Sequence, residues 1–235
     1  MEPQLRTEIS DENCIIVGSL NSKYIKQLIQ KEKLEKKQLQ GKNEKYIITT
    51  VDAPFNGVKK ALVIAGSDRR GAIYGVYELS KQLGVSPWYW WMDVPVVKRT
   101  EAYILPGIYT DGEPAVKYRG IFLNDEAPCL TSWVKQYYGT DFGDHRFYAQ
   151  VCELILRLKG NFLWPAMWGW AFYADDSLNS KTADEMGVII GTSHHEPMAR
   201  NHQEWARKRN EYGAWNYSTN KKSVRSCFFE KVLRG

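Results

Sequence analysis

The sequence predicts a mixed α/β fold in two parts, an α/β sandwich domain followed by parallel βα units. Strands and helices alternate along the first half, which is typical of sheets covered by helices. Prolines interrupt residues 92–115, and such a stretch is a plausible domain boundary. In the second half each predicted strand is followed by a helix. We therefore expect an N-terminal α/β domain at 1–112 and a second domain at 113–235.

The first part is expected to contain three strands and two helices. Short apolar runs predict strands at residues 13–20, 45–52 and 59–66, and amphipathic patterns predict helices at residues 21–37 and 67–84. The apolar stripe of the first helix is formed by Tyr24, Ile25, Leu28 and Ile29. Ser67 or Asp68 is the expected cap of the second helix, and Gly84 ends it. Its side chains expected to face inward are Ile73, Val76, Tyr77 and Leu83.

The second part repeats a strand and helix rhythm. Strands are predicted at residues 116–124, 161–168 and 188–192, and helices at residues 144–160, 180–187, 196–210 and 220–234. Asp144 is the expected cap of the first of these helices, and Gly160 its stop.

Polar and aromatic residues gather where each strand of the second part ends. In a parallel βα barrel, side chains at the carboxyl ends of the strands share one mouth, where catalysis occurs. The residues expected to line a substrate site there are Asn124, Asp125, Glu126, Trp164, Asp175, His194, His195 and Glu196. Trp168 follows the second strand as well.

Several chemistries compete for these residues. A mononuclear metal hydrolase built on His194, His195 and Glu196 is disfavoured, because neighbouring residues on a strand point to opposite faces. A polar turn that caps the next helix is the other alternative to substrate binding. Asp125 and Glu126 diverge for the same reason, so they are not expected to flank one glycosidic bond, and an ion pair with Arg119 is their structural alternative. No signature of a serine or cysteine nucleophile is present.

The composition of the chain excludes some classes of binding partner. The net charge is +5, but 32 basic and 27 acidic residues are interleaved, so no nucleic-acid surface is expected. No apolar run approaches the roughly 18 residues of a membrane span, so no membrane is expected either. The first residues lack the apolar core of a signal peptide, which leaves localisation open. Nine tryptophans and fourteen tyrosines supply flat apolar platforms of the kind on which sugar rings pack.

Four blocks of sequence together resemble a known enzyme family. They are ALVIAGSDRRGAIYGVYELSKQLGVSPWYWWMDVPV, YRGIFLNDEAP, KGNFLWPAMW and DEMGVIIGTSHHEPM. This set closely resembles glycoside hydrolase family 115, the xylan α-1,2-glucuronidases, from about Asn13 to the C-terminus. The resemblance implies an α/β domain followed by a (β/α)8 TIM barrel, of which this chain would hold the first three βα units. It also implies an inverting hydrolysis without cofactor, with glucuronoxylan or its oligosaccharides as partner and Trp164 as a stacking wall.

The same resemblance implies that this chain is an N-terminal fragment. The acid and base carboxylates of the family are expected on later strands, beyond Gly235, so the incomplete barrel is expected to be inactive alone. A non-catalytic, carbohydrate-binding remnant is the alternative. Export is expected for the complete protein, because it would act on xylan, and oligomeric state stays open.

Overall fold

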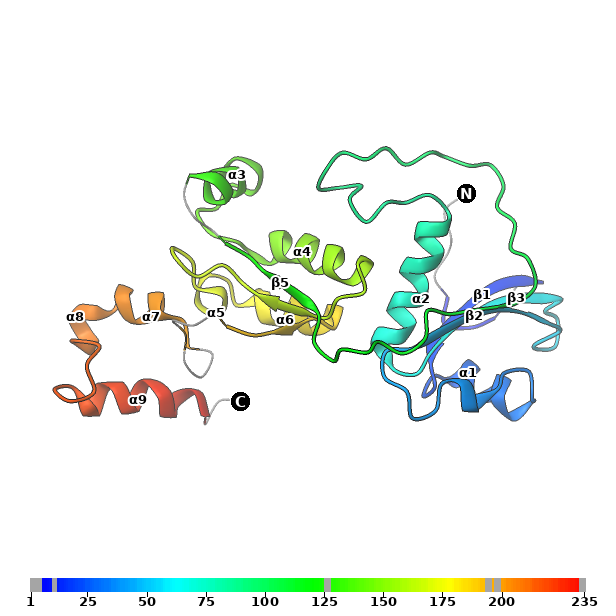
Figure 1. Cartoon of the computed structure of the whole chain (residues 1–235), viewed down its shortest axis with the longest axis horizontal. Coiled ribbons are helices and arrows are strands. Elements are labelled where there is room, and N and C mark those ends of the chain that lie inside the picture. The colour runs from blue at the N-terminus through cyan, green and yellow to red at the C-terminus, as the bar shows by residue number, and fades with distance from the viewer. Residues whose placement is uncertain (1–5, 10–11, 125–127, 193–195, 197–199, 233–235) are drawn as a thin grey trace. The chain divides into compact units, whose positions relative to one another are not determined.

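The structure is a computed structural model that describes residues 6–9, 12–124, 128–192, 196 and 200–232. It divides into two compact units (Figure 1). The first unit comprises Met1–Lys117 with Leu156–Lys159, and the second comprises Tyr118–Ile155 with Gly160–Gly235. The α/β fold class is confirmed, whereas the domain limits at 1–112 and 113–235 stay a prediction.

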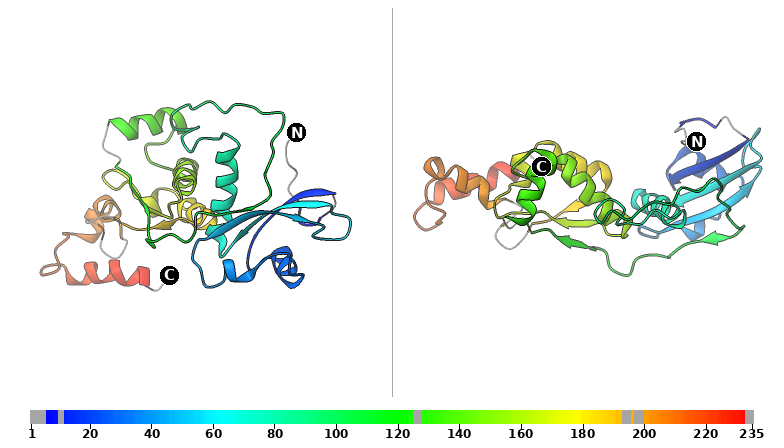
Figure 2. Two further views of the ribbon diagram at one scale, coloured as in Figure 1. Left: turned by 45° about the vertical axis from the view of Figure 1, so that its right-hand side comes forward. Right: turned by 90° about the horizontal axis from the view of Figure 1, so that it is seen from above.

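The first unit is built on a four-stranded mixed sheet with the order β1-β3-β2-β4. Its elements are β1 (Asn13–Ser19), α1 (Lys23–Gln30), a short 3₁₀ helix (Lys36–Gln38), β2 (Tyr46–Asp52), β3 (Lys60–Gly66), α2 (Arg69–Gln82) and β4 (Ile108–Tyr109). β1 runs parallel to β3, and β2 is antiparallel to both β3 and β4. Figure 2 shows this sheet from two further directions.

The two helices pack on opposite faces of this sheet. Ile25 and Leu28 of α1 are fully buried in a cluster with Val63 of β3. The next residue of the same strand, Ile64, faces α2, where it lies against Gly75. Because successive side chains of a strand point to opposite faces, the sheet is covered on both sides, as the predicted sandwich requires.

The first helix is shorter than the sequence pattern predicts. α1 ends at Gln30, and the charge-rich residues that follow leave the helix through Glu32, which has a φ of 55°. The Lys33 amide then donates to the Leu28 carbonyl at 2.9 Å, a reversal typical of helix C-termini. The turn returns Leu34 to the core, where it is 6% exposed. Burial of this side chain therefore outweighs the helix propensity of its neighbours.

The inward face of α2 also differs from the prediction. Asp68 caps the helix as expected, since its Oδ1 accepts from the Gly71 amide at 2.8 Å. The buried residues, however, include Gly71, Ala72, Tyr74 and Gly75, while Val76 is 39% exposed. A Cβ at Gly71 would lie 2.3 Å from the Lys45 carbonyl oxygen. The small residues let the helix lie directly on the chain beneath it, so Val76 and Leu83 are exposed while Ile73 and Tyr77 stay partly buried.

The second unit is built on a three-stranded parallel sheet with the order β5-β6-β7. Its strands are β5 (Gly120–Phe122), β6 (Phe162–Trp164) and β7 (Ile189–Ile190). Its helices are α3 (Cys129–Tyr138), α4 (His145–Arg157), α5 (Phe172–Asp175), α6 (Leu178–Met186), α7 (His202–Arg207), α8 (Arg209–Tyr212) and α9 (Lys221–Val232). Of these elements, α3 and α5 were not predicted.

Aromatic side chains form the core of the second unit. Phe147 and Tyr148, in the first turn of α4, are fully buried. Phe147 lies 5.7 Å from the ring of Trp170, and Tyr148 lies 4.7 Å from Phe172. α4 thereby packs against the chain that follows β6, which holds the first βα units together.

None of the helices in the described part of the chain combines the length and apolar character that a membrane span requires.

Candidate functional site

The carboxyl ends of the three parallel strands of the second unit lie at one edge of the sheet. Phe122 pairs with Trp164 in the register of β5 and β6. Beyond the last pair the Leu123 amide donates to the Trp164 carbonyl, and the Gly191 amide donates to the Leu163 carbonyl, both at 2.9 Å. The segments after β5, β6 and β7 therefore start side by side, which is the arrangement predicted for a shared mouth.

Two exposed aromatic rings stand at this edge. Phe122 is 45% exposed and Trp164 is 40% exposed, and their ring centroids are 6.1 Å apart in an edge-to-face arrangement. Gly191 determines where the indole lies, because a Cβ at that position would come within 2.5 Å of Trp164 Nε1. The missing side chain lets the tryptophan cross the end of β7.

A buried carboxylate follows β7. Glu196 is 3% exposed, and its backbone carbonyl accepts a hydrogen bond from Thr192 Oγ1 at 2.9 Å. Its Oε1 lies 4.0 Å from His202 Nδ1. Burial, and then the negative charge of Glu196, raises the pKa of Tyr173 on α5. Tyr173 therefore stays a neutral hydroxyl beside the carboxylate.

The start of α7 is fixed to the segment after β6. Asn201 caps the helix by accepting from the Gln203 amide at 2.8 Å. The Gln203 side chain donates to the Trp168 carbonyl and lies 3.2 Å from His202 Nε2. The His202 ring is also 6.2 Å from the Trp168 ring. The histidine beside Glu196 is therefore held from two sides.

Asp175 also holds α7 in place, through Arg207. Its Oδ2 accepts from the Ala171 amide at 2.6 Å, and its Oδ1 accepts from Arg207 Nη1. Arg207 Nη2 also donates to the Gly169 carbonyl at 3.0 Å. Asp175 and Glu196 thus both contact α7, the former through Arg207 and the latter through His202. Because its side chain is only 3% exposed, Asp175 contacts protein groups in this structure and holds α7 in place through Arg207.

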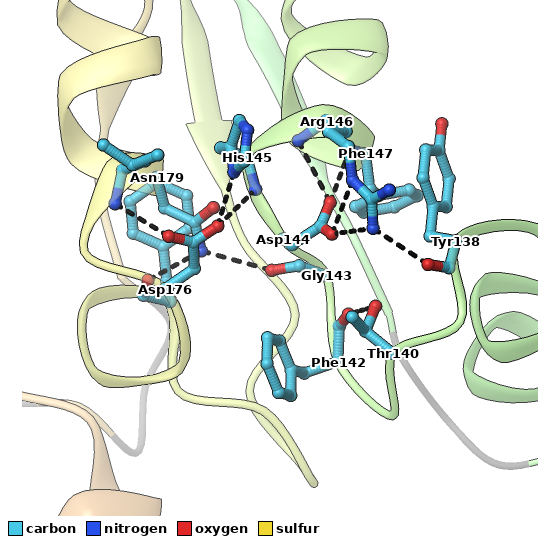
Figure 3. Close-up of polar contacts among 12 residues, drawn as sticks. Tyr138, Thr140, Phe142, Gly143, Asp144, His145, Arg146, Phe147, Asp176 and Asn179 are labelled. Carbon is cyan, nitrogen blue, oxygen red and sulfur yellow. Dashed lines mark hydrogen bonds and ion pairs between the residues drawn. The ribbon is translucent and has the colours of Figure 1, made fainter.

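A second polar cluster joins the segments after β5 and β6 (Figure 3). Asp176 Oδ2 lies 2.7 Å from His145 Nδ1 and accepts from the His145 amide at 2.9 Å, while its Oδ1 accepts from the Leu178 amide. Buried Asn179 donates to the carbonyls of Gly143 and Phe172. These contacts fix two neighbouring loops at the same edge of the sheet.

The beginning of α4 contributes a further ion pair. Asp144 caps the helix as predicted, because its Oδ1 accepts from the amides of Arg146 and Phe147 at 3.0 and 3.2 Å. Its Oδ2 accepts from Arg146 Nε at 2.9 Å, and Arg146 Nη2 reaches the Tyr138 carbonyl at 2.8 Å. This links the end of α3 to α4.

Comparison with known proteins shows to which family this chain belongs. The family model described as glycosyl hydrolase family 115 matches residues 111–235, which is more than half of the chain. The chain belongs to glycoside hydrolase family 115. The resemblance seen in the four sequence blocks is thereby confirmed.

One solved structure of the same family is similar over most of this chain. It is described as a novel family GH115 4-O-methyl-α-glucuronidase, BtGH115A, with specificity for decorated arabinogalactans. The two are 32% identical with a TM-score of 0.78, and the match covers 94% of this chain and 28% of that enzyme. A comparison with curated proteins gave no match.

Half of the site residues predicted for this family 115 chain can be placed. Asn124 is exposed at the end of β5, and Trp164, Asp175 and Glu196 occupy the positions given above. The remaining four lie outside the described residues and stay predictions: Asp125, Glu126, His194 and His195. Among the residues that the structure describes, no cluster of histidine, cysteine and carboxylate side chains is suited to a metal ion.

His145, Asn179, Tyr173 and His202 were missed by sequence reasoning. His145 and Asp176 are 31 positions apart, so no local pattern joins them. The one feature of the sequence that could have indicated Asp176 is its position after the predicted strand at 161–168, next to Asp175.

Breaking the His145–Asp176 pair is expected to make stability depend less on pH. Burial alone would raise the pKa of Asp176, but hydrogen bonds from the amides of His145 and Leu178 and from the His145 ring lower it overall. Because the pKa of Asp176 is lower in the folded state than its ordinary value of 3.8, the ionised carboxylate stabilises the fold at pH values above 3.8. This contribution to stability is lost as the pH falls through the pKa of the folded state. Asp176→Asn should therefore reduce the free energy of unfolding by about 1–2 kcal/mol at pH 7, and by less below pH 4. Urea unfolding at both pH values measures this; an equal loss at both would contradict it.

Proposed function

We propose that this chain is the front part of an α-glucuronidase that releases glucuronic acid, or its 4-O-methyl ether, from the side chains of xylan. Membership of a glycoside hydrolase family supports hydrolysis of a glycosidic bond. The uronic acid is supported by BtGH115A, which is described as a 4-O-methyl-α-glucuronidase. Because that relative has specificity for decorated arabinogalactans, arabinogalactan is the alternative polysaccharide here.

The observation that carries the proposal is the exposed Phe122–Trp164 pair at the strand ends. The apolar C–H face of a sugar packs on an indole, whereas its hydroxyls need polar partners. Glu196, which follows β7 at the same edge, has a side chain that is only 1% exposed, whereas the His202 side chain beside it is 30% exposed. We assign Trp164 as the stacking wall, and Glu196 as a carboxylate that acts on the substrate through His202, whose ring can bond a sugar hydroxyl.

The proposed reaction is hydrolysis with inversion. One carboxylic acid protonates the leaving oxygen while a carboxylate removes a proton from the attacking water, with the two groups roughly 6.5–9.5 Å apart. The described aspartates at this edge are already engaged, Asp175 by Arg207 and Asp176 by His145. The resemblance to family 115 supports the proposal that acid and base lie on later strands, beyond Gly235, and that the chain binds substrate without cleaving it. Acid–base hydrolysis of this kind needs no cofactor.

Removing the stacking wall should weaken sugar binding. Trp164→Ala is expected to raise the Kd for a glucuronoxylan oligosaccharide about tenfold, because an aromatic anchor is lost. Isothermal titration calorimetry of the 235-residue chain measures the change. Trp88→Ala is the matched control, since Trp88 is 39% exposed and lies in the first unit. Equal effects of the two variants would contradict the assignment.

Release of uronic acid separates the enzyme from a binding protein. We expect the 235-residue chain to release none from glucuronoxylan, and a protein that continues this chain through the complete family to release it. Such a complete protein that binds the polysaccharide without releasing sugar would favour the non-catalytic remnant. Cleavage by the 235-residue chain alone would overturn the placement of acid and base.

A further inference from the structure

The first unit contains a cavity that the proposed reaction does not use. It has a volume of about 550 Å³ and is lined by β2, α2 and residues 103–111. In Figure 1 the chain between α2 and β4 has no helix or strand and returns to the sheet only at β4. The volume lies within the roughly 300–1,000 Å³ of small-molecule sites.

One wall of this cavity is aromatic and held in place. The Tyr109 hydroxyl donates to the Leu105 carbonyl at 2.8 Å, and β4 pairs Tyr109 with Ile48 of β2. Thr110 Oγ1 donates to the Tyr46 carbonyl at 2.6 Å. At the rim, Tyr103 is 86% exposed. Three tyrosine rings therefore line the space, and one of them is almost fully open to solvent.

The polar side of the cavity is a connected network. Glu78 Oε2 accepts from Lys159 Nζ, and Glu78 Oε1 accepts from Gln82 Nε2, both at 2.7 Å. Lys159, which belongs to the first unit, also pairs with Asp111 and lies 3.3 Å from the Tyr46 hydroxyl. The charged side chains among the lining residues are the carboxylates of Glu78 and Asp111, with Lys159 bonded to both from outside the lining. The network offers both acceptors and donors.

This chemistry selects against anions. A uronate or a phosphate inside the cavity would face the two lining carboxylates, whereas a neutral hydroxyl group can both donate to a carboxylate and accept from an amide or ammonium. Open tyrosine faces complement the apolar face of a sugar ring. We propose that this cavity binds neutral sugar units, such as the backbone of a polysaccharide, apart from the acidic sugar assigned to the second unit.

Binding of neutral oligosaccharides to the 235-residue chain tests the proposal. Calorimetry with xylotriose and with galactobiose should give a saturable signal that glucuronic acid does not compete away. Tyr103→Ala should raise the Kd about tenfold, because it removes an aromatic anchor at an exposed position that tolerates truncation. Tyr217→Ala is the control, since Tyr217 is 55% exposed and lies in the second unit.

The outcomes of these titrations distinguish a failure of the cavity assignment from a failure of the proposed function. The choice of xylotriose rests on the proposed function, so binding of galactobiose alone would contradict xylan as substrate and leave the cavity assignment standing. Xylotriose binding that survives Trp164→Ala but not Tyr103→Ala supports the cavity. No binding of either sugar, or an equal loss in Tyr103→Ala and Tyr217→Ala, would overturn it. Displacement of the sugar by spermidine would assign the cavity to amines instead.

Discussion

Replacing Phe147 with alanine is expected to lower the free energy of unfolding of the second unit by about 3–5 kcal/mol. The ring is fully buried and lies within 5.1–6.4 Å of the rings of Trp133, Tyr138, Tyr148 and Trp170. Its loss leaves a cavity where α4 packs against the chain after β6. Thermal unfolding followed by near-ultraviolet circular dichroism measures the effect.

A conservative exchange at the same position provides the control. Phe147→Leu keeps most of the apolar volume and should lose much less, about 1–2 kcal/mol. A loss below 1 kcal/mol in Phe147→Ala would mean that the aromatic cluster does not hold the unit together.

Gly120→Ala is expected to separate β5 from β6. A Cβ at this position would lie 1.7 Å from the Phe162 carbonyl oxygen and 2.9 Å from Phe162 Cβ. Since the nearest atom belongs to the backbone of the central strand, it cannot turn away as a flexible side chain would. We expect a loss of about 3 kcal/mol, at the upper end of typical overpacking.

The same substitution should impair sugar binding, because β5 carries Phe122 to its place beside Trp164. Gly107→Ala is the control for stability, since the atoms nearest to a Cβ there belong to the Tyr109 side chain, at 3.4 Å, which is an ordinary contact. Unfolding and oligosaccharide titration of both variants provide the measurements. Unchanged binding in Gly120→Ala would contradict the role of β5 in the site.

Much of the fold followed from local patterns. β1 and β3 begin and end close to the limits of their apolar runs, and Asp68 and Asp144 cap their helices as the sequence predicts. These features depend on residues within a few positions of one another. Three-dimensional packing decided the rest: the inward face of α2 depends on a close approach at Gly71, and no periodicity records it.

The site was predictable only in outline. Trp164 and Glu196 could be predicted to lie at one edge because they follow parallel strands; their role in binding stays a prediction. His202 was overlooked, because a continuous helix was predicted through 196–210, whereas α7 begins only at His202 after the Asn201 cap. A residue at the start of a helix looks like an ordinary surface residue in the sequence, and nothing in the local pattern indicates that His202 lies near a buried carboxylate.

The close approach of Trp164 to Gly191 means that a change at position 191 would reorient the proposed sugar platform without replacing either of its aromatic rings. Any side chain introduced at position 191 would push the indole out of its present place, since it would come within 2.5 Å of the ring nitrogen. The orientation of the Trp164 ring therefore depends on the lack of a side chain at Gly191, directly after β7. In related proteins, divergence at this single backbone position should accompany divergence in which sugar the platform prefers.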